Sequence, residues 1–268
     1  MNSIHEKARE VKEKVNTVHK WFKIQAMRAD KREQRRGERR GEMLDAAMRV
    51  VLEGGLESLT IARLARELGV AGGALYRYFS GKDAVVVALQ ERAVESFRAV
   101  LEEDLNAARA SAESSGANTQ VRALLLAAVA PTSYLAHGTR APGLHRLLDR
   151  SLSHPTALLT DEEARQVDEA LAPLLRLCAS QLEHAAECSA LTGGDANVRT
   201  HLLWAATHGL DHFRKRDRIQ PASLRVPALT NALLMDLFVG WGANRAQLDE
   251  ALSALRDLNA LRAGDSRS

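Results

Sequence analysis

Apolar residues recur every three or four positions along most of this chain, with polar residues between them. That spacing is typical of helices that bury one face, and no strand-like alternation stands out. Stretches containing glycine or proline separate the periodic segments. They place the later helices over residues 121–137, 143–152, 162–189, 197–216, 224–240 and 245–262. The pattern predicts an all-α chain without internal repeats.

Residues 42–108 are expected to hold three short helices and a long one. Thr60 can cap the second short helix, and Gly69 can end it in the left-handed conformation. The third is very short and is expected to end near Tyr78. A long helix then runs over about residues 82–108. Two short helices joined by a glycine-containing turn form a helix-turn-helix.

The segment before residue 42 has two parts. Residues 4–26 place apolar side chains alternately four and three positions apart, a heptad seam that could pack on the body or pair with a second copy. Residues 28–42 contain seven basic side chains. Gly37 and Gly41 are expected to weaken helix continuity across this basic stretch.

The charge of the chain is unevenly spread. Residues 1–44 contain 13 Lys or Arg and 7 Asp or Glu, whereas all 268 residues together carry a net charge of only +3. A basic leading segment often marks a nucleic-acid partner, but it can equally be the solvated face of a helix. Such a segment could enter the minor groove of DNA. The arginines that would make this contact are Arg35, Arg36, Arg39 and Arg40.

The composition suits a soluble protein of one or two domains, since 46% of the residues are hydrophobic and 26% are charged. No run of about 18 apolar residues predicts a membrane span, and the charged N-terminus is unlike a secretion signal. Cys178 and Cys188 lie ten positions apart in one expected helix. That separation of about 15 Å is too long for a disulfide. A cytoplasmic protein without a membrane partner is therefore expected.

A nucleotide-binding loop is excluded at Gly81-Lys82. Such a loop needs a glycine five positions before Gly81 and a Ser or Thr directly after Lys82. The chain has Tyr76 and Asp83 at these positions, and the carboxylate would repel phosphate.

The helix-turn-helix carries a specific order of residues: Thr60, Leu64-Ala65, Gly69-Val70-Ala71, Gly73, Leu75-Tyr76, Tyr78-Phe79 and Lys82-Asp83. With this order and spacing, the stretch from Arg40 to Val94 resembles the DNA-binding domain of TetR/AcrR-family transcriptional regulators. A weaker resemblance covers LLWAATHGLDHF, residues 202–213. It is similar to a Trp-x-x-x-His-Gly motif in the C-terminal domain of some members.

The resemblance implies phosphate contacts by four side chains, namely Thr60, Tyr76, Tyr78 and Lys82. The chain departs from the family where the recognition helix begins, because Ala71 replaces the usual Ser and Gly72 replaces a frequent polar residue. Residues 71–74 read Ala-Gly-Gly-Ala and carry no side-chain donor for base edges. The remaining candidates for recognition are methyl contacts by Ala71 or Ala74, close backbone approach at Gly72 and Gly73, the side chains of Arg63 and Arg77, DNA shape and the basic segment.

The resemblance also implies a domain organisation. The expected parts are a basic N-terminal extension (1–38), a helix-turn-helix domain (39–94), a ligand-binding and dimerisation domain (95–263) and a disordered tail (264–268). We expect a homodimeric repressor that a small, largely apolar ligand releases from its DNA operator, with dimerisation through helices at about 197–215 and 224–241. The alternatives are a ligandless DNA-binding or architectural protein and, more remotely, a metal- or Cys-dependent hydrolase.

A ligand pocket is expected between the C-terminal helices, mostly apolar with a few polar groups. The candidate lining residues are Tyr134, His137, Leu148, Leu174, Cys178, Leu182, Trp204, His208 and Phe213.

No enzymatic activity and no cofactor are expected, because no acid–base constellation stands out. His208 and His212 have a spacing that suits one metal ion. The resemblance at residues 202–213 nevertheless favours a structural or pocket role, and no metal is expected.

Overall fold

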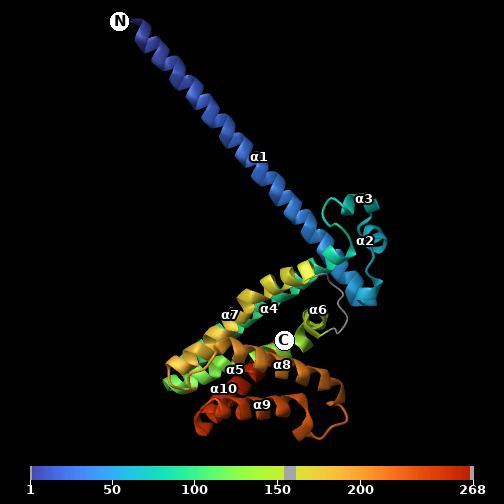
Figure 1. Ribbon diagram of the computed structural model, residues 1–268, viewed down its shortest axis with the longest axis vertical. Helices are drawn as coiled ribbons and strands as arrows, with labels where there is room; N and C mark the ends of the chain where they lie inside the picture. Colours follow the sequence, from blue (N-terminus) through green and yellow to red (C-terminus); the bar gives the residue numbers. More distant parts are fainter. Residues whose placement is uncertain (1, 154–160, 266–268) are drawn as a thin grey trace. The chain divides into compact units, whose positions relative to one another are not determined.

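In the computed structural model, every regular element of the described residues is a helix, and these residues contain no strand (Figure 1). The all-α prediction is confirmed. The structure describes residues 2–153 and 161–265. No helix within these ranges is long and apolar enough to cross a membrane.

The chain divides into two compact units, Met1–Val85 and Val86–Ser268. We call them the N-terminal unit and the C-terminal unit. The division falls inside α4 (Lys82–Ser114), the long helix expected from about residue 82.

Some expectations fall on residues outside the described ranges. Most of the break expected between the helices at 143–152 and 162–189 lies outside them, as do the last three residues of the expected tail. Gly264 and Asp265, also assigned to the tail, still belong to a helix. The apolar side chains of the heptad seam at residues 4–26 are likewise outside the described ones.

The N-terminal unit begins with a single helix, α1 (Asn2–Gly54), which runs unbroken through the basic stretch. The expectation that Gly37 and Gly41 would weaken its continuity is wrong. A glycine inside a helix costs only about 1 kcal/mol, and good helix formers surround both positions. A hydrogen bond from Gln34 to Glu38, 3.0 Å long and one turn apart, supports the helix around Gly37.

The rest of this unit is the predicted helix-turn-helix, formed by η1 (Leu56–Ser58), α2 (Ile61–Leu68) and α3 (Gly72–Leu75). Thr60 caps α2, since its hydroxyl accepts a hydrogen bond from the backbone N–H of Arg63 at 3.0 Å. Gly69 ends α2 in the left-handed conformation at φ 64°, as predicted. The third helix is a single turn that ends at Leu75, before the expected end near Tyr78.

A small apolar core holds these helices together. Its buried side chains are Met43, Ala46, Ala47, Val50, Leu59, Leu64, Ala65, Leu75 and Phe79. The guanidinium of Arg40 lies over the ring of Phe79, 5.3 Å from its centre. This cation–π contact attaches the core to the basic stretch of α1.

The C-terminal unit contains most of α4 and six further α-helices: α5 (Thr119–Arg140), α6 (Pro142–Ser153), α7 (Asp161–Glu187), α8 (Ala196–Asp211), α9 (Val226–Gly240) and α10 (Arg245–Asp265). Two 3-10 turns, η2 (His212–Arg216) and η3 (Ala222–Leu224), lie between α8 and α9. α5 packs against α6, α7, α8 and α10, so its apolar residues are buried on most sides.

The boundaries of three elements differ from the prediction. α4 extends to Ser114, into the expected polar loop at 111–120. The helix expected over 197–216 is an α-helix only as far as Asp211. α9 begins at Val226 and has Pro227 in its first turn. Backbone N–H groups in the first turn of a helix have no acceptor within the helix, so proline, which lacks this group, is tolerated there.

A buried carboxylate connects α4, α5 and α10. Asp104 is 4% exposed and accepts a hydrogen bond from the hydroxyl of Ser133 at 2.5 Å. Arg262 of α10 makes an ion pair with it, and Arg140 of α5 lies 4.0 Å away. Opposite charges and a hydroxyl donor thus compensate the burial of this charge.

Candidate functional site

The start of α3 presents backbone to solvent. Ala71 and Gly73 are exposed, whereas Gly72 and Ala74 are half-buried. A side chain added at Gly72 or Gly73 would meet nothing within 4 Å, so packing inside the unit does not require glycine there. The two glycines are explained if another molecule approaches this backbone closely.

The polar side chains predicted to contact DNA lie around this turn. Tyr76 is 60% exposed, and Arg77 is exposed beside it. Tyr78 and Lys82 are half-buried. Together with the start of α3, these side chains form a surface of backbone, phenol and cationic groups around the turn.

Two other predicted contacts have partners inside the unit. The Thr60 hydroxyl accepts the capping bond, which leaves only its hydrogen for another acceptor. The guanidinium of Arg63 makes an ion pair with Glu53 at 3.3 Å. Arg63 must give up this pair before it can read a base.

The four arginines of the basic segment lie on α1 and are exposed. Arg39 pairs with Glu42 at 2.5 Å, and Arg40 lies over Phe79, whereas Arg35 and Arg36 make no ion pair or cation–π contact with another described residue. An α-helix is about 10 Å wide and the minor groove about 6 Å, so this helical segment does not fit the minor-groove interpretation. Its charges can still meet phosphates.

A cavity of about 60 Å³ lies in the C-terminal unit between α4, α5, α6, α7 and α8. Six of the nine predicted ligand residues line it: Tyr134, Leu148, Leu174, Cys178, Leu182 and Trp204. The other wall residues are mainly apolar, and Phe97, Leu171 and Leu203 among them were not predicted. The structure therefore contains a small apolar cavity within the part of the fold where a pocket was expected.

The three remaining candidates do not line this cavity. His137 is buried, His208 is half-buried behind Tyr134, and Phe213 is 48% exposed on η2. Burial lowers the pKa of His137 to about 4. Burial also raises the pKa of Cys178 to about 12, so its thiol stays protonated and is a poor nucleophile.

A network of polar side chains adjoins the cavity at Tyr134. The Tyr134 hydroxyl hydrogen-bonds Nδ1 of His208 at 2.9 Å, and burial raises the pKa of Tyr134 strongly. Nε2 of His145 lies 2.9 Å from the carboxylate of Asp211. Burial would raise the pKa of Asp211, but hydrogen bonds from His145 and Arg214 lower it to about 2.

Sequence reasoning assigned no role to His145, Asp149 or Asp211. They lie on α6 and at the end of α8, and the contacts between these two helices join residues far apart in sequence. Periodicity reports the buried face of a helix but not which helix packs on it. The spacing of His208 and His212 was the one available signal.

A small domain with an exposed recognition turn, continuous with a helical unit that contains a cavity, defines a two-part helix-turn-helix protein. The family model described as "Bacterial regulatory proteins, tetR family" matches residues 43–89. Residues 43–89 therefore form a DNA-binding domain of the TetR type, which confirms the resemblance found in the sequence for this domain.

Curated relatives match over a short stretch. A fatty acid metabolism regulator protein of Bacillus subtilis is 31% identical over 64 residues, 24% of this chain and 33% of the relative. The HTH-type transcriptional regulator BetI of Brucella anthropi is 37% identical over 70 residues, 26% of this chain and 34% of the relative. The matched stretch thus spans about a third of each relative.

Solved structures share the fold over a longer stretch. FadR of Bacillus subtilis in complex with stearoyl-CoA superposes with a TM-score of 0.54 at 20% identity, covering 74% of this chain and 97% of that one. AibR in complex with isovaleryl coenzyme A and operator DNA gives a TM-score of 0.52 at 14% identity, covering 75% and 98%. At these identities the likeness concerns the fold. The Trp-x-x-x-His-Gly resemblance at residues 202–213 stays a prediction.

Proposed function

We propose that this protein is a homodimeric transcriptional regulator whose affinity for a DNA operator is controlled by a small, largely apolar ligand. The observation that carries the proposal is the exposed, glycine-rich start of α3 on a TetR-type helix-turn-helix. Members of this family are normally not enzymes, and we propose no enzymatic activity. Repression is the mode we expect. Binding of chromosomal DNA requires a cytoplasmic protein.

In this proposal the backbone of residues 71–74 lies against the floor or wall of the major groove. Tyr76, Tyr78 and Lys82 contact phosphates and fix the orientation of α3. Arg77, exposed beside them, is the side chain best placed to read a base, because Arg63 is paired with Glu53. The arginines of α1 add charge that is independent of DNA sequence.

The apolar cavity supports the ligand part of the proposal. The names of two proteins similar in fold include acyl-CoA ligands, stearoyl-CoA and isovaleryl coenzyme A. An acyl thioester is therefore the first ligand class to test. The cavity has room for roughly four water molecules, so an acyl chain requires its lining helices to move apart.

α4 offers a route by which such a movement reaches DNA. It carries Phe97 in the cavity wall and begins at Lys82, beside the helix-turn-helix. A ligand that binds better to one position of α4 than to another shifts the population of DNA-competent protein.

A second copy of the chain is the partner we propose for α8 and α9. Val198 and Leu202 on α8 and Val239 on α9 are exposed apolar side chains. They lie on the helices expected to form the dimer. Leu234, in contrast, is 1% exposed and belongs to the core of the C-terminal unit.

The test begins with selection of DNA from a random library by the full-length chain. We expect a palindromic sequence with half-sites about 34 Å apart. Acyl-CoAs of increasing chain length are then added, with CoA as the control, and DNA affinity and thermal stability are measured. Failure to enrich any sequence would reject DNA regulation. Enrichment without a response to any compound would instead favour the ligandless alternative.

A further inference from the structure

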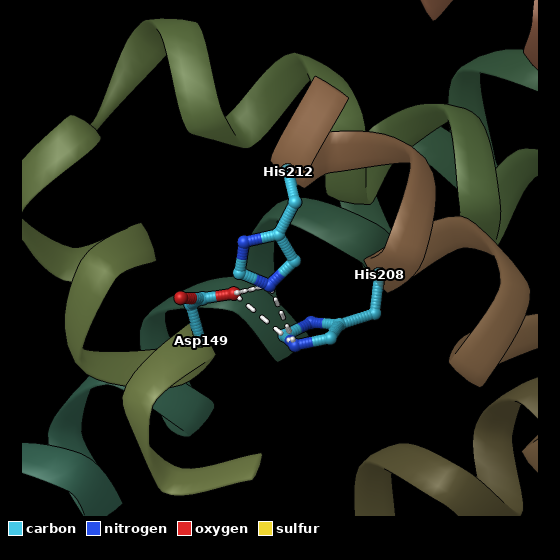
Figure 2. A group of neighbouring side chains, drawn as sticks. All are labelled: Asp149, His208 and His212. Atoms are coloured by element: carbon cyan, nitrogen blue, oxygen red, sulfur yellow. Dashed lines mark hydrogen bonds and ion pairs between the residues drawn. The ribbon is translucent and has the colours of Figure 1, made fainter. Parts of the chain in front are cut away.

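Three side chains with metal-ligating atoms meet where α6 lies beside the end of α8 (Figure 2). They are Asp149 on α6, His208 on α8 and His212 at the start of η2. We propose that they form a binding site for one transition-metal ion of the zinc type. The site goes beyond the proposed regulatory function and does not depend on it.

The distances between the three ligand atoms match a metal site. Oδ1 of Asp149 lies 3.3 Å from Nε2 of His208 and 3.6 Å from Nε2 of His212. The two Nε2 atoms are 3.4 Å apart. Ligands at tetrahedral corners about 2.0–2.1 Å from zinc are separated from one another by roughly 3.3–3.4 Å. An ion can therefore contact all three atoms with little movement of the side chains.

His208 is held in the orientation and tautomer that a ligand needs. Its Nδ1 makes a 2.9 Å hydrogen bond with the Tyr134 hydroxyl, so Nδ1–H can donate to that oxygen and leave the lone pair of Nε2 for the metal. Metal-ligating histidines usually donate their second ring N–H to a fixed acceptor. Tyr134 is 4% exposed and lies in the cavity wall, so it is a rigid acceptor.

The chemistry of the donors selects the metal. Two imidazoles and one carboxylate suit zinc and its neighbours, whereas magnesium and calcium prefer oxygen ligands alone. Three protein ligands leave a fourth position for water or for an atom of another molecule. The side chain of His212 is 54% exposed and that of Asp149 is 26% exposed, so an ion can enter from solvent.

A bound ion would connect α6 directly to the end of α8. Leu148, next to Asp149, and Tyr134, which holds His208, both line the apolar cavity. The ion would thus stabilise one wall of the cavity. By linkage, occupancy of the metal site and of the cavity would change each other's affinity.

The test uses the untagged full-length chain, freed of metal by a chelator and titrated with zinc chloride in a calorimeter. His184 and Cys188 form another pair one helical turn apart, with Sγ 3.6 Å from Nε2. All proteins therefore carry Cys188→Ser. We expect one tight zinc site per chain. Because His212 is half exposed, His212→Gln should leave the fold intact, which circular dichroism checks.

His212→Gln should weaken zinc binding at least about 100-fold, and Asp149→Asn and Tyr134→Phe about 10-fold or more. The control is His201→Gln, an exposed histidine of α8 whose Nδ1 lies 2.7 Å from the Asn197 carbonyl. Its zinc affinity should equal that of the parent. Cobalt in the parent should give the visible absorption of a four-coordinate ion, and this signal should vanish in His212→Gln. Absence of a stoichiometric zinc site, or equal affinities of the parent and His212→Gln, would overturn the proposal and leave a hydrogen-bonded cluster only.

Discussion

At the scale of single residues, His137 is a buried polar group with an unusual cost. Its Nε2 is buried without a hydrogen-bond partner among the described residues, and its ring lies 5.3 Å from that of Phe97. Burial lowers its pKa to about 4, whereas the unfolded chain has an ordinary value near 6.5. Between these values the unfolded state takes up a proton that the folded state refuses. The free energy of unfolding is therefore unaffected by this histidine above about pH 6.5, and it decreases as the pH falls from there towards 4.

We predict that His137→Leu makes the stability of the C-terminal unit less dependent on pH. At pH 5 the histidine should cost the native protein roughly 2 kcal/mol relative to pH 7.5, and the variant should not show this loss. Urea unfolding followed by tryptophan fluorescence at both pH values measures the difference. His201→Leu, at an exposed position, is the control. An equal loss of stability in His137→Leu and native protein would contradict the assignment.

Gly242 is a second residue whose identity is set by its immediate surroundings. Its φ is 93°, and a Cβ there would overlap Cγ2 of Thr192 and lie 3.2 Å from the Thr192 nitrogen. That nitrogen donates to the Trp241 carbonyl at 2.8 Å, so Thr192 cannot easily move away. Gly242→Ala should therefore destabilise the unit by about 2 kcal/mol or more.

Gly240→Ala is the matched control for Gly242→Ala, two residues away at the end of α9. A Cβ at Gly240 meets nothing within 4 Å and its φ is not positive. This variant should be neutral or gain up to about 1 kcal/mol. Thermal unfolding compares the two, and similar melting temperatures would rule out the proposed strain.

At the scale of elements, the sequence predicted most helices to within a few residues, because breakers bound each periodic segment. α5, α6 and α7 agree in this way with the expected ranges. The continuity of α1 was mispredicted since two glycines cost less than the rest of the helix contributes. The early end of α8 was missed because Asp211, its last residue, is bonded to His145 of another helix and to Arg214 of the following turn, and periodicity does not report such bonds.

The connection of α4 to α10 through Asp104 can be measured directly. We predict a coupling of at least about 1 kcal/mol between Asp104→Asn and Arg262→Met in a double-mutant cycle, because the carboxylate is buried. Arg98→Met on the exposed side of α4 should change stability little, despite ion pairs with Glu95 and Glu102, because solvent screens these charges. Additive effects of the first pair would mean that the Asp104–Arg262 ion pair does not help to hold α10.

At the scale of the whole molecule, periodicity and motifs located both the recognition turn and the helices around the cavity. They did not predict that Asp149 lies next to His208 and His212, because the packing of α6 against α8 depends on the complete fold. Nor did they show which arginines are engaged. Arg63 and Arg39 look equivalent to Arg35 in the sequence, but carboxylates hold the first two.

The arginines of α1 provide a prediction for DNA binding as a whole. Arg35→Gln with Arg36→Gln should lower the slope of log affinity against log salt by about 1 to 2, with similar losses for specific and unrelated DNA. The exposed Arg245 on α10 serves as the control, and Arg245→Gln should leave the slope unchanged. Fluorescence anisotropy over a salt series gives the values. An unchanged slope in the double variant would show that this part of α1 is only a solvated helix face.

The last prediction joins dimerisation to DNA binding. Leu202 on α8 is 53% exposed, and a second copy of the chain is the partner proposed for this surface. Leu202→Asp places an unpaired charge in an apolar interface, which is costly, so it should yield monomers in size-exclusion chromatography with light scattering. Operator affinity should fall at least about tenfold, because two half-sites are no longer bound together. Leu261→Asp, at a 71% exposed position of α10, should leave both properties unchanged. A dimeric Leu202→Asp variant with native affinity would place the interface elsewhere.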